Sequence, residues 1–200
     1  MIKRILVFSL FLIVSTFTFG ADNFVRAGLL KTSLTISPGY LLQRNCNNIY
    51  LNGESEYFAE DRISLRGDAF FYSGSQTKPE LMDINHHVLF GVFYHFPCKQ
   101  FDFYSGIQPG ITIARPLPPF SYLDYVYPET KALPTLSVMT GVTFYLFDYF
   151  NFFANVRYIH AKYLAVYYGP IPLDELTISA GLGLQIQTKR KFRIQAVPPF

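Results

Sequence analysis

The sequence contains no tryptophan, only two cysteines and few charged residues, which make up 16% of the chain. The two cysteines, Cys46 and Cys98, are too few for a metal site. We expect them not to be bonded to each other, because they fall in connections at opposite ends of the fold predicted below. No segment after residue 20 reaches about 18 uninterrupted apolar residues, which argues against a helical membrane protein.

The first 20 residues have the pattern of a secretory signal peptide. Lys3 and Arg4 precede an apolar run of about ten residues, and small residues near Gly20 favour cleavage after that position. The net charge of +3 includes these two cations, so the exported chain is nearly neutral. A neutral chain has no basic surface for nucleic acid.

What the sequence has in abundance is aromatic residues and alternation of apolar with polar residues. It contains 21 Phe and 15 Tyr. From Leu176 to Gln187 (LTISAGLGLQIQ) every second residue is apolar, and successive side chains of a strand point to opposite faces. Such segments are about ten to thirteen residues long, which lets a tilted strand cross a bilayer. The pattern predicts transmembrane strands with one lipid-facing side.

Turn-rich breaks divide the exported chain into eight predicted strands. Long breaks are Ser73 to Asp83, Pro116 to Pro134 and Tyr168 to Asp174; shorter turns are Arg44 to Asn48, Glu60-Asp61, Pro97 to Gln100 and Asp148-Tyr149. The strands cover about 30–43, 49–59, 62–73, 84–96, 101–115, 135–147, 151–167 and 175–187. Alternating long and short connections predict an all-β fold, an eight-stranded antiparallel up-and-down transmembrane β-barrel with both termini periplasmic. Residues 21–187 would form the barrel and 188–200 a short basic periplasmic tail.

Two smaller features belong to these strands. Pro38 and Pro109 lie inside them and cannot donate to a ladder, so they predict bulges or ends of regular pairing. The short turns carry aromatics on both sides, such as Phe96 and Phe101, as expected of an aromatic girdle at one membrane interface.

The alternation also predicts a polar interior. The inward-facing polar set is Glu54, Glu56, Arg66, Asp68, Asn155, Arg157 and Gln185. The lumen of an eight-stranded barrel is just wide enough to be filled by side chains, and charges there must be paired. We therefore expect a packed polar network; a proton- or ion-conducting path is the alternative.

The four histidines do not predict a catalytic site. An esterase would need a histidine within hydrogen-bond reach of a serine and an orienting carboxylate, and the residues around His160 include no serine. His86 and His87 are adjacent on a strand and point to opposite faces, while His95 lies beside a short turn. We expect no catalytic residue, metal or cofactor.

The longest predicted outer loop combines prolines with four aromatic residues. These are Phe120, Tyr122, Tyr125 and Tyr127. Such side chains bind a partner at little ordering cost, because they have few rotamers to lose. They equally suit a lid over the barrel or an upper aromatic girdle.

Two segments carry a family resemblance in addition to the leader. They are EYFAEDRISLRGDAFFY (Glu56 to Tyr72) and FDFYSGIQPGITIARP (Phe101 to Pro116). With them the chain resembles the small outer-membrane β-barrel proteins of Gram-negative bacteria, the OmpA/OmpX-like class. The resemblance implies a monomer in the outer membrane, in contact with its lipid and inserted by the barrel-assembly machinery. It implies no activity.

Three functions fit these observations. The first is a non-enzymatic outer-membrane barrel with a structural, adhesive or surface-recognition role, whose loops meet an extracellular ligand or surface partner. The alternatives are a narrow channel or small hydrophobic-ligand carrier, and a lipid-modifying enzyme. A soluble lipocalin-like barrel is the rival fold, but it would point its apolar residues inward.

Overall fold

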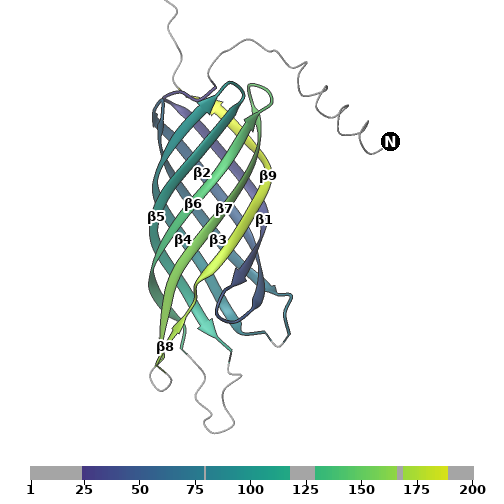
Figure 1. Ribbon diagram of the computed structural model, residues 1–200, viewed down its shortest axis with the longest axis vertical. Helices are drawn as coiled ribbons and strands as arrows, with labels where there is room; N and C mark the ends of the chain where they lie inside the picture. Colours follow the sequence, from purple (N-terminus) through teal and green to yellow (C-terminus); the bar gives the residue numbers. More distant parts are fainter. Residues whose placement is uncertain (1–23, 79, 118–128, 166–168, 189–200) are drawn as a thin grey trace, which may run out of the picture.

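The computed structural model describes residues 24–78, 80–117, 129–165 and 169–188, in which the chain forms one closed antiparallel sheet (Figure 1). Its strands are β1 (Leu29–Leu41), β2 (Cys46–Glu60), β3 (Ile63–Ser75), β4 (Met82–Cys98), β5 (Phe101–Pro116), β6 (Lys131–Tyr145), β7 (Phe150–Ala165), β8 (Gly169–Pro172) and β9 (Glu175–Gln187). Consecutive strands pair from β1 to β7, β7 also pairs with β9, and β9 closes the ring on β1. This confirms the predicted eight-stranded up-and-down barrel.

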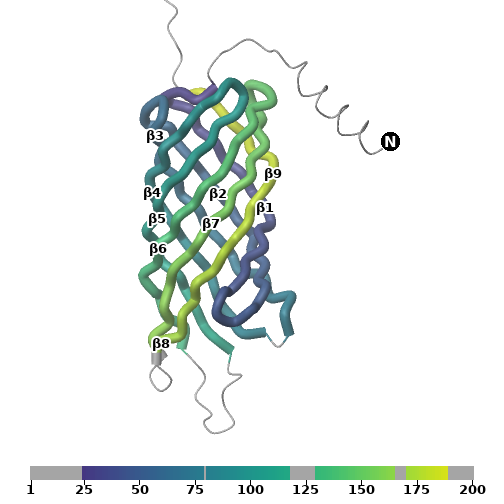
Figure 2. The backbone as a smooth tube through the Cα atoms, in the orientation of Figure 1, coloured from purple at the N-terminus to yellow at the C-terminus, as the bar shows by residue number. Residues whose placement is uncertain are grey.

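The barrel has two unlike ends (Figure 2). At one end, here called the turn end, Asp61-Arg62, Lys99-Gln100 and residues 146–149 join consecutive strands. Both ends of the described chain also lie there, since the Thr188 amide donates to the Gly28 carbonyl at 2.8 Å. The other end, the loop end, carries the longer connections and the added strand β8. Within the described residues, no helix is long and apolar enough to cross a membrane.

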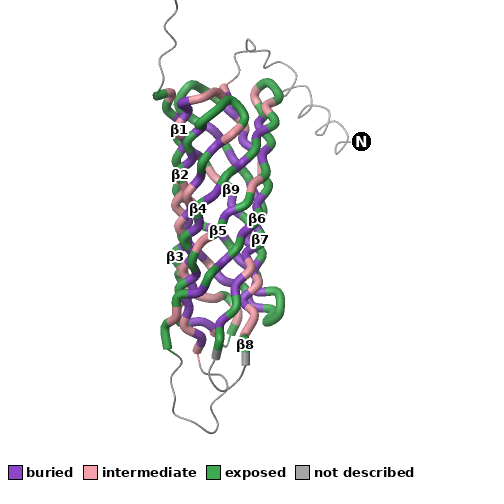
Figure 3. Tube along the Cα trace, turned by 90° about the vertical axis from the view of Figure 1, so that its left-hand side faces the viewer, coloured by how far each residue is buried: buried purple, intermediate pink, exposed green. Residues whose placement is uncertain are grey.

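Each barrel strand presents alternate residues inward and outward, and Figure 3 shows this as alternating buried and exposed positions. The outward positions are apolar: Leu34 and Ile36 are each 67% exposed, and Ile186 is 58% exposed. The inward positions include buried charged and amide side chains. A soluble barrel would have the reverse arrangement, so the lipocalin-like alternative is wrong.

Several strands extend further than predicted. β2 begins at Cys46, within the predicted turn Arg44 to Asn48 and three residues before the predicted strand start at 49, and β6 begins at Lys131 within the predicted loop. Four residues of the predicted loop from Tyr168 to Asp174 form β8, which pairs with the end of β7. For β2 the physical reason is that polar side chains are favourable inside this barrel, whereas β6 extends because its inward Leu133 is buried among apolar side chains. Asn48, for example, points inward and is fully buried, so a polar run does not mark a loop here.

Pro38 and Pro109 lie at interruptions of a ladder, as predicted. The pairing of β4 with β5 passes from Leu89↔Gly110 to Val92↔Ile107, with Pro109 in the gap. The pairing of β1 with β9 passes from Ser33↔Gly183 to Gly39↔Thr177, with Pro38 in the gap. Because proline has no N–H to donate, each faces the neighbour with which pairing is broken.

The chain before β1 covers the turn end. Val25 packs with Leu29, Phe58 and Tyr145, all buried, and the Phe24 ring stacks on Tyr145 with centroids 5.4 Å apart. This apolar cluster lies at the turn end of the lumen. The expected signal peptide, residues 1–20, and residues 189–200 of the expected tail lie outside the described residues.

Candidate functional site: a packed polar interior

The interior holds charges of both signs on side chains that solvent hardly reaches. Among the described residues, the cations Lys31, Arg66 and Arg157 lie there with the carboxylates Glu54, Glu56, Asp68, Asp102 and Glu175. Removing a charge from water costs several kcal/mol unless partners compensate for the lost hydration. The contacts of each carboxylate therefore decide what this interior can do.

The middle of the barrel is organised around Asp68. Its carboxylate lies 3.2 Å from Arg66 Nε and 2.9 Å from Arg157 Nη2, and it accepts a hydrogen bond from Gln108 Nε2 at 2.6 Å. Arg66 also pairs with Glu54, on the neighbouring strand. Two arginines and two carboxylates thus form one connected cluster.

Towards the turn end, Glu56 joins three further groups. Lys31 Nζ lies 2.7 Å from one of its oxygens, and His95 Nε2 lies 3.0 Å from the other. The Ser64 hydroxyl donates to the same carboxylate at 2.5 Å, and Asp102 lies 2.8 Å from His95 Nδ1. The Lys31 ammonium also lies over aromatic rings, which lowers the cost of burying it.

Ser64, His95 and Asp102 stand in the order of a hydrolase triad, with 2.8 Å between Ser64 Oγ and His95 Nε2 and 2.8 Å between His95 Nδ1 and Asp102. All three side chains have no exposed surface. The Phe58 ring covers His95, with centroids 4.4 Å apart. A nucleophile must reach a substrate carbonyl, and this serine is enclosed in the structure. The sequence did not reveal the arrangement because its members lie on three different strands.

Towards the loop end, a third cluster surrounds Glu175. The carboxylate accepts hydrogen bonds from Asn48 at 2.9 Å, Tyr50 at 2.7 Å and Asn85 at 3.2 Å. His87 Nε2 lies 3.5 Å away, an electrostatic contact without a hydrogen bond. Three neutral donors can stabilise a buried carboxylate without a cation.

These clusters reach across the lumen. In the ring order β1-β2-β3-β4-β5-β6-β7-β9, strands four places apart face each other. Asp68 of β3 meets Arg157 of β7, and Glu175 of β9 meets Asn85 of β4. Lys31 of β1 lies over the Tyr104 ring of β5, with Nζ 5.5 Å from the centroid. Side chains of opposite strands are therefore in contact at three heights.

The loop end of the interior is apolar. Its buried cluster comprises Leu41, Cys46, Met82, Ala114, Leu133, Ala161, Tyr163 and Leu173. The Tyr163 hydroxyl donates to the Glu129 carbonyl at 2.6 Å, so its one polar atom is satisfied. Apolar clusters thus lie at both ends of the polar interior.

The sequence matches no protein-family model and no curated protein. The structure is similar to the Neisserial surface protein NspA, with 13% identity, 80% of this chain and 96% of that chain covered, and a TM-score of 0.60. It is also similar to the outer membrane protein OprG of Pseudomonas aeruginosa, with 12% identity and a TM-score of 0.56; the match covers 83% of this chain and 100% of OprG. For Ail, the attachment invasion locus protein of Yersinia pestis, the identity is 15%, the coverages 80% and 99%, and the TM-score 0.50.

The chain has the fold of an eight-stranded outer-membrane β-barrel. The outer wall of this outer-membrane barrel fold has an aromatic zone at the turn end. Exposed rings there include Phe96 at 57%, Phe147 at 62% and Tyr149 at 65%. Aromatic side chains favour the boundary between lipid and water, so this zone has the composition of an interface girdle.

The structure places the predicted interior residues in two groups. Glu54, Glu56, Arg66, Asp68 and Arg157 belong to the connected ionic clusters. Asn155 and Gln185 are also buried but lie outside the ion pairs. Gln185 Nε2 of β9 donates to the Phe147 carbonyl at 3.0 Å. This hydrogen bond connects β9 to the turn between β6 and β7.

Sequence reasoning missed several interior groups. These are Lys31, His87, His95, Asp102 and Glu175. Each occupies the inward parity of its strand, so extending the alternation to every strand end would have identified it. The aromatic loop residues Phe120, Tyr122, Tyr125 and Tyr127 lie outside the described residues.

The two cysteines lie at opposite ends of the outer-membrane barrel fold, where the topology predicted them. Cys46 begins β2 at the loop end and is buried, whereas Cys98 ends β4 at the turn end and is exposed. Both are free. Among the described residues, no group of three or more His, Cys, Asp or Glu could hold a metal ion.

Proposed function

We propose that the protein is a non-enzymatic outer-membrane barrel with a structural, adhesive or surface-recognition role through its loops. In this proposal residues 1–20 are a cleaved signal peptide, the barrel-assembly machinery inserts the chain, and the barrel is a monomer in contact with outer-membrane lipid. The turn end faces the periplasm, since short turns lie on that side of such barrels.

The observation that carries the proposal is the contact between opposite strands at three heights of the lumen. A channel needs a continuous water path, and a carrier needs an enclosed space for its cargo. Side chains that meet across the lumen leave neither at those heights. The enclosed position of Ser64 argues in the same way against hydrolysis of lipid. Recognition would therefore occur on the loops and the outer wall.

The solved structures offer a precedent of the same kind. Ail, whose barrel this chain resembles, has been crystallised in complex with the heparin analogue sucrose octasulfate. In our proposal the four aromatics Phe120, Tyr122, Tyr125 and Tyr127 supply recognition in this chain. Their rigid rings would bind a surface partner at low entropic cost.

Cysteine labelling of intact cells tests the location and orientation. The native Cys98 is exposed at the turn end, and Lys78 is exposed at the loop end. A membrane-impermeant maleimide should label a Lys78→Cys/Cys98→Ser variant in intact cells, and should label Cys98 of the native chain only after the outer membrane is permeabilised. Labelling of Cys98 in intact cells would mean that the barrel is inserted the other way round.

Adherence of expressing cells to cultured epithelial monolayers tests the role of the loop. We expect a variant with all four loop aromatics changed to serine to adhere less than the native protein at equal surface level. The amount of protein at the cell surface is measured by maleimide labelling of Lys78→Cys/Cys98→Ser, introduced both into the chain with the native loop and into the loop variant. Unchanged adherence of the variant would remove these aromatics from the recognition role.

A further inference from the structure

The seam between β6 and β7 opens at the loop end of the barrel. The ladder that joins these strands stops at Thr135↔Ala161. Beyond that point Lys131–Pro134 remain paired with β5, whereas Lys162–Ala165 pair with β8. The two strands therefore separate over their last residues and leave a notch in the barrel wall.

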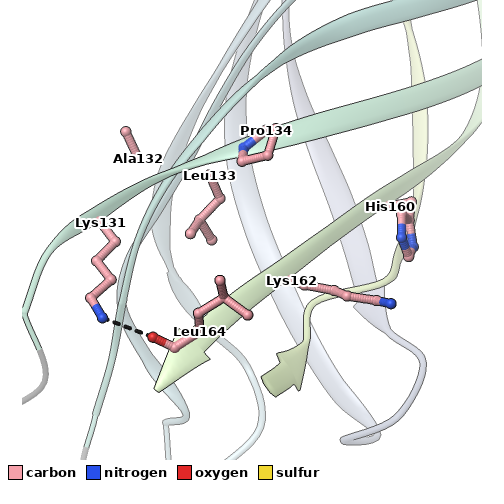
Figure 4. A pocket seen from close by; sticks show the side chains of 7 residues that line it. All are labelled: Lys131, Ala132, Leu133, Pro134, His160, Lys162 and Leu164. Carbon is pink, nitrogen blue, oxygen red and sulfur yellow. Dashed lines mark hydrogen bonds between the residues drawn. The ribbon is translucent and has the colours of Figure 1, made fainter. Parts of the chain in front are cut away.

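This notch is a cleft of about 690 Å³. Figure 4 shows its lining: Lys131, Ala132, Leu133 and Pro134 from β6, and His160, Lys162 and Leu164 from β7. Its volume lies within the range of sites that bind small organic groups, about 300–1,000 Å³. Leu164 is 64% exposed, so part of the apolar lining is open to a ligand.

The cleft has a positive charge. Two of its seven lining residues are lysines, and none carries a carboxylate. Lys131 Nζ donates to the Leu164 carbonyl at 2.8 Å, a contact that positions the ammonium without neutralising it. Asp174, which lies beside the cleft, is engaged by His160 at 2.5 Å and by Gln43 at 2.7 Å.

The cleft also adjoins the lipid-facing belt. Along the same two strands, the outward side chains next to it are Leu136, Val138, Val156 and Tyr158, each more than a third exposed. A site with cations at the edge of an apolar belt suits an amphiphile whose anionic headgroup meets the lysines while its chains lie along the belt.

We propose that the cleft binds the phosphate headgroup of an outer-leaflet lipid. Lys131 and Lys162 contact the phosphate, and Pro134, on the side of the cleft nearer the belt, contacts the first part of the acyl chains. This inference rests on the proposed function, because the loop end must face the outer leaflet. It assigns to the wall of the barrel a recognition site separate from the loops.

Native mass spectrometry of the purified barrel in detergent micelles tests the site. The probes are dimyristoyl phosphatidic acid and dimyristoyl phosphatidylcholine, which differ in the headgroup. We expect the native protein to bind the phosphatidic acid more tightly. Lys131→Gln/Lys162→Gln should weaken that binding roughly 30-fold, since each basic residue near a lipid surface contributes about a factor of five. Lys131→Arg/Lys162→Arg, which keeps the charge, should restore it.

Arg115 supplies the matched control. It lies at the same end of the barrel, but its guanidinium is paired with Asp83, with Nε 2.6 Å from Oδ2. Arg115→Gln should bind phosphatidic acid as the native protein does.

Equal losses of phosphatidic acid binding in Arg115→Gln and in the double lysine variant, or no loss in the double lysine variant, would overturn the proposal. Displacement of the lipid by equimolar inorganic phosphate would also overturn the proposal, because it would show that the cleft binds free phosphate rather than a lipid. Binding in micelles is independent of orientation in cells, so failure here is distinguishable from failure of the labelling experiment.

Discussion

At the scale of single residues, Asp68 is a buried carboxylate between two buried arginines. Its side chain has no exposed surface and contacts Arg66, Arg157 and Gln108. Arg157 reaches Asp68 through Nη2, which also donates to Met139 Sδ at 3.1 Å, and its Nε and Nη1 have no hydrogen-bond partner among the described residues. The carboxylate therefore compensates much of the cost of burying the Arg157 guanidinium. A neutral side chain at position 68 would leave that cost uncompensated.

We predict that Asp68→Asn lowers the free energy of unfolding by about 3–5 kcal/mol, the usual cost of removing one partner of a buried ion pair. Urea unfolding in lipid vesicles measures this loss of stability. The folded fraction is read from the heat-modifiable shift, the difference in gel migration between the folded barrel in unheated samples and the unfolded chain. Asp83→Asn is the control, because the Asp83 side chain is 42% exposed in its pair with Arg115; its effect should be at most about 1 kcal/mol. Equal effects of the two substitutions would contradict the assignment.

Glu175 gives a second prediction at this scale. All its described partners but His87 are neutral donors, so Glu175→Gln turns one acceptor oxygen into an NH₂ group facing Asn48, Tyr50 or Asn85. Two donors would then face each other in a buried site, which costs about 1–3 kcal/mol. The same urea titration checks this loss. Glu60→Gln, at an exposed position beside a turn, should leave the midpoint unchanged.

At the scale of the strand pair, the backbones of β4 and β5 leave no room for a side chain at Gly91, in the gap around Pro109. A Cβ added to Gly91 would lie 2.0 Å from the Ile107 carbonyl oxygen, and backbone cannot move away without separating the strands. Gly53 is different, since the nearest atom to an added Cβ is Leu34 Cδ1 at 3.8 Å. The two glycines therefore form a matched pair for substitution.

We expect Gly91→Ala to destabilise the barrel by about 1–3 kcal/mol, the typical cost of overpacking. Gly53→Ala should be neutral or slightly stabilising, because alanine has less backbone freedom to lose. Thermal midpoints from the heat-modifiable shift compare the two. If Gly91→Ala melts at the native temperature, the close approach of β4 and β5 does not constrain position 91.

The strands also show what sequence reasoning could reach. Alternation predicted the inward direction of Arg66, Asp68 and Arg157, because it depends only on strand geometry. It could not predict that Asp68 meets Arg157, since partners across a lumen depend on the stagger of the closed barrel. The start of β2 was missed for another reason. Polar residues such as Asn48 normally indicate turns, but inside this barrel they face other polar groups.

At the scale of the whole molecule, the interior is a stack of layers. An apolar cluster lies at each end, and three levels of polar contact between opposite strands lie between them. Each level of contact crosses the lumen between a different pair of strands. The closed state should therefore not depend on any single contact.

This arrangement predicts how the barrel behaves in a planar lipid bilayer. The native protein should show no steady conductance. Asp68→Ser/Arg157→Ser removes both partners of the middle contact, yet the variant should also stay closed, because Glu175 still reaches Asn85 and Lys31 still covers Tyr104. The heat-modifiable shift verifies that the variant is folded. Steady current through the native barrel would refute a filled lumen, whereas current through the variant alone would show that the Asp68–Arg157 contact is the single barrier.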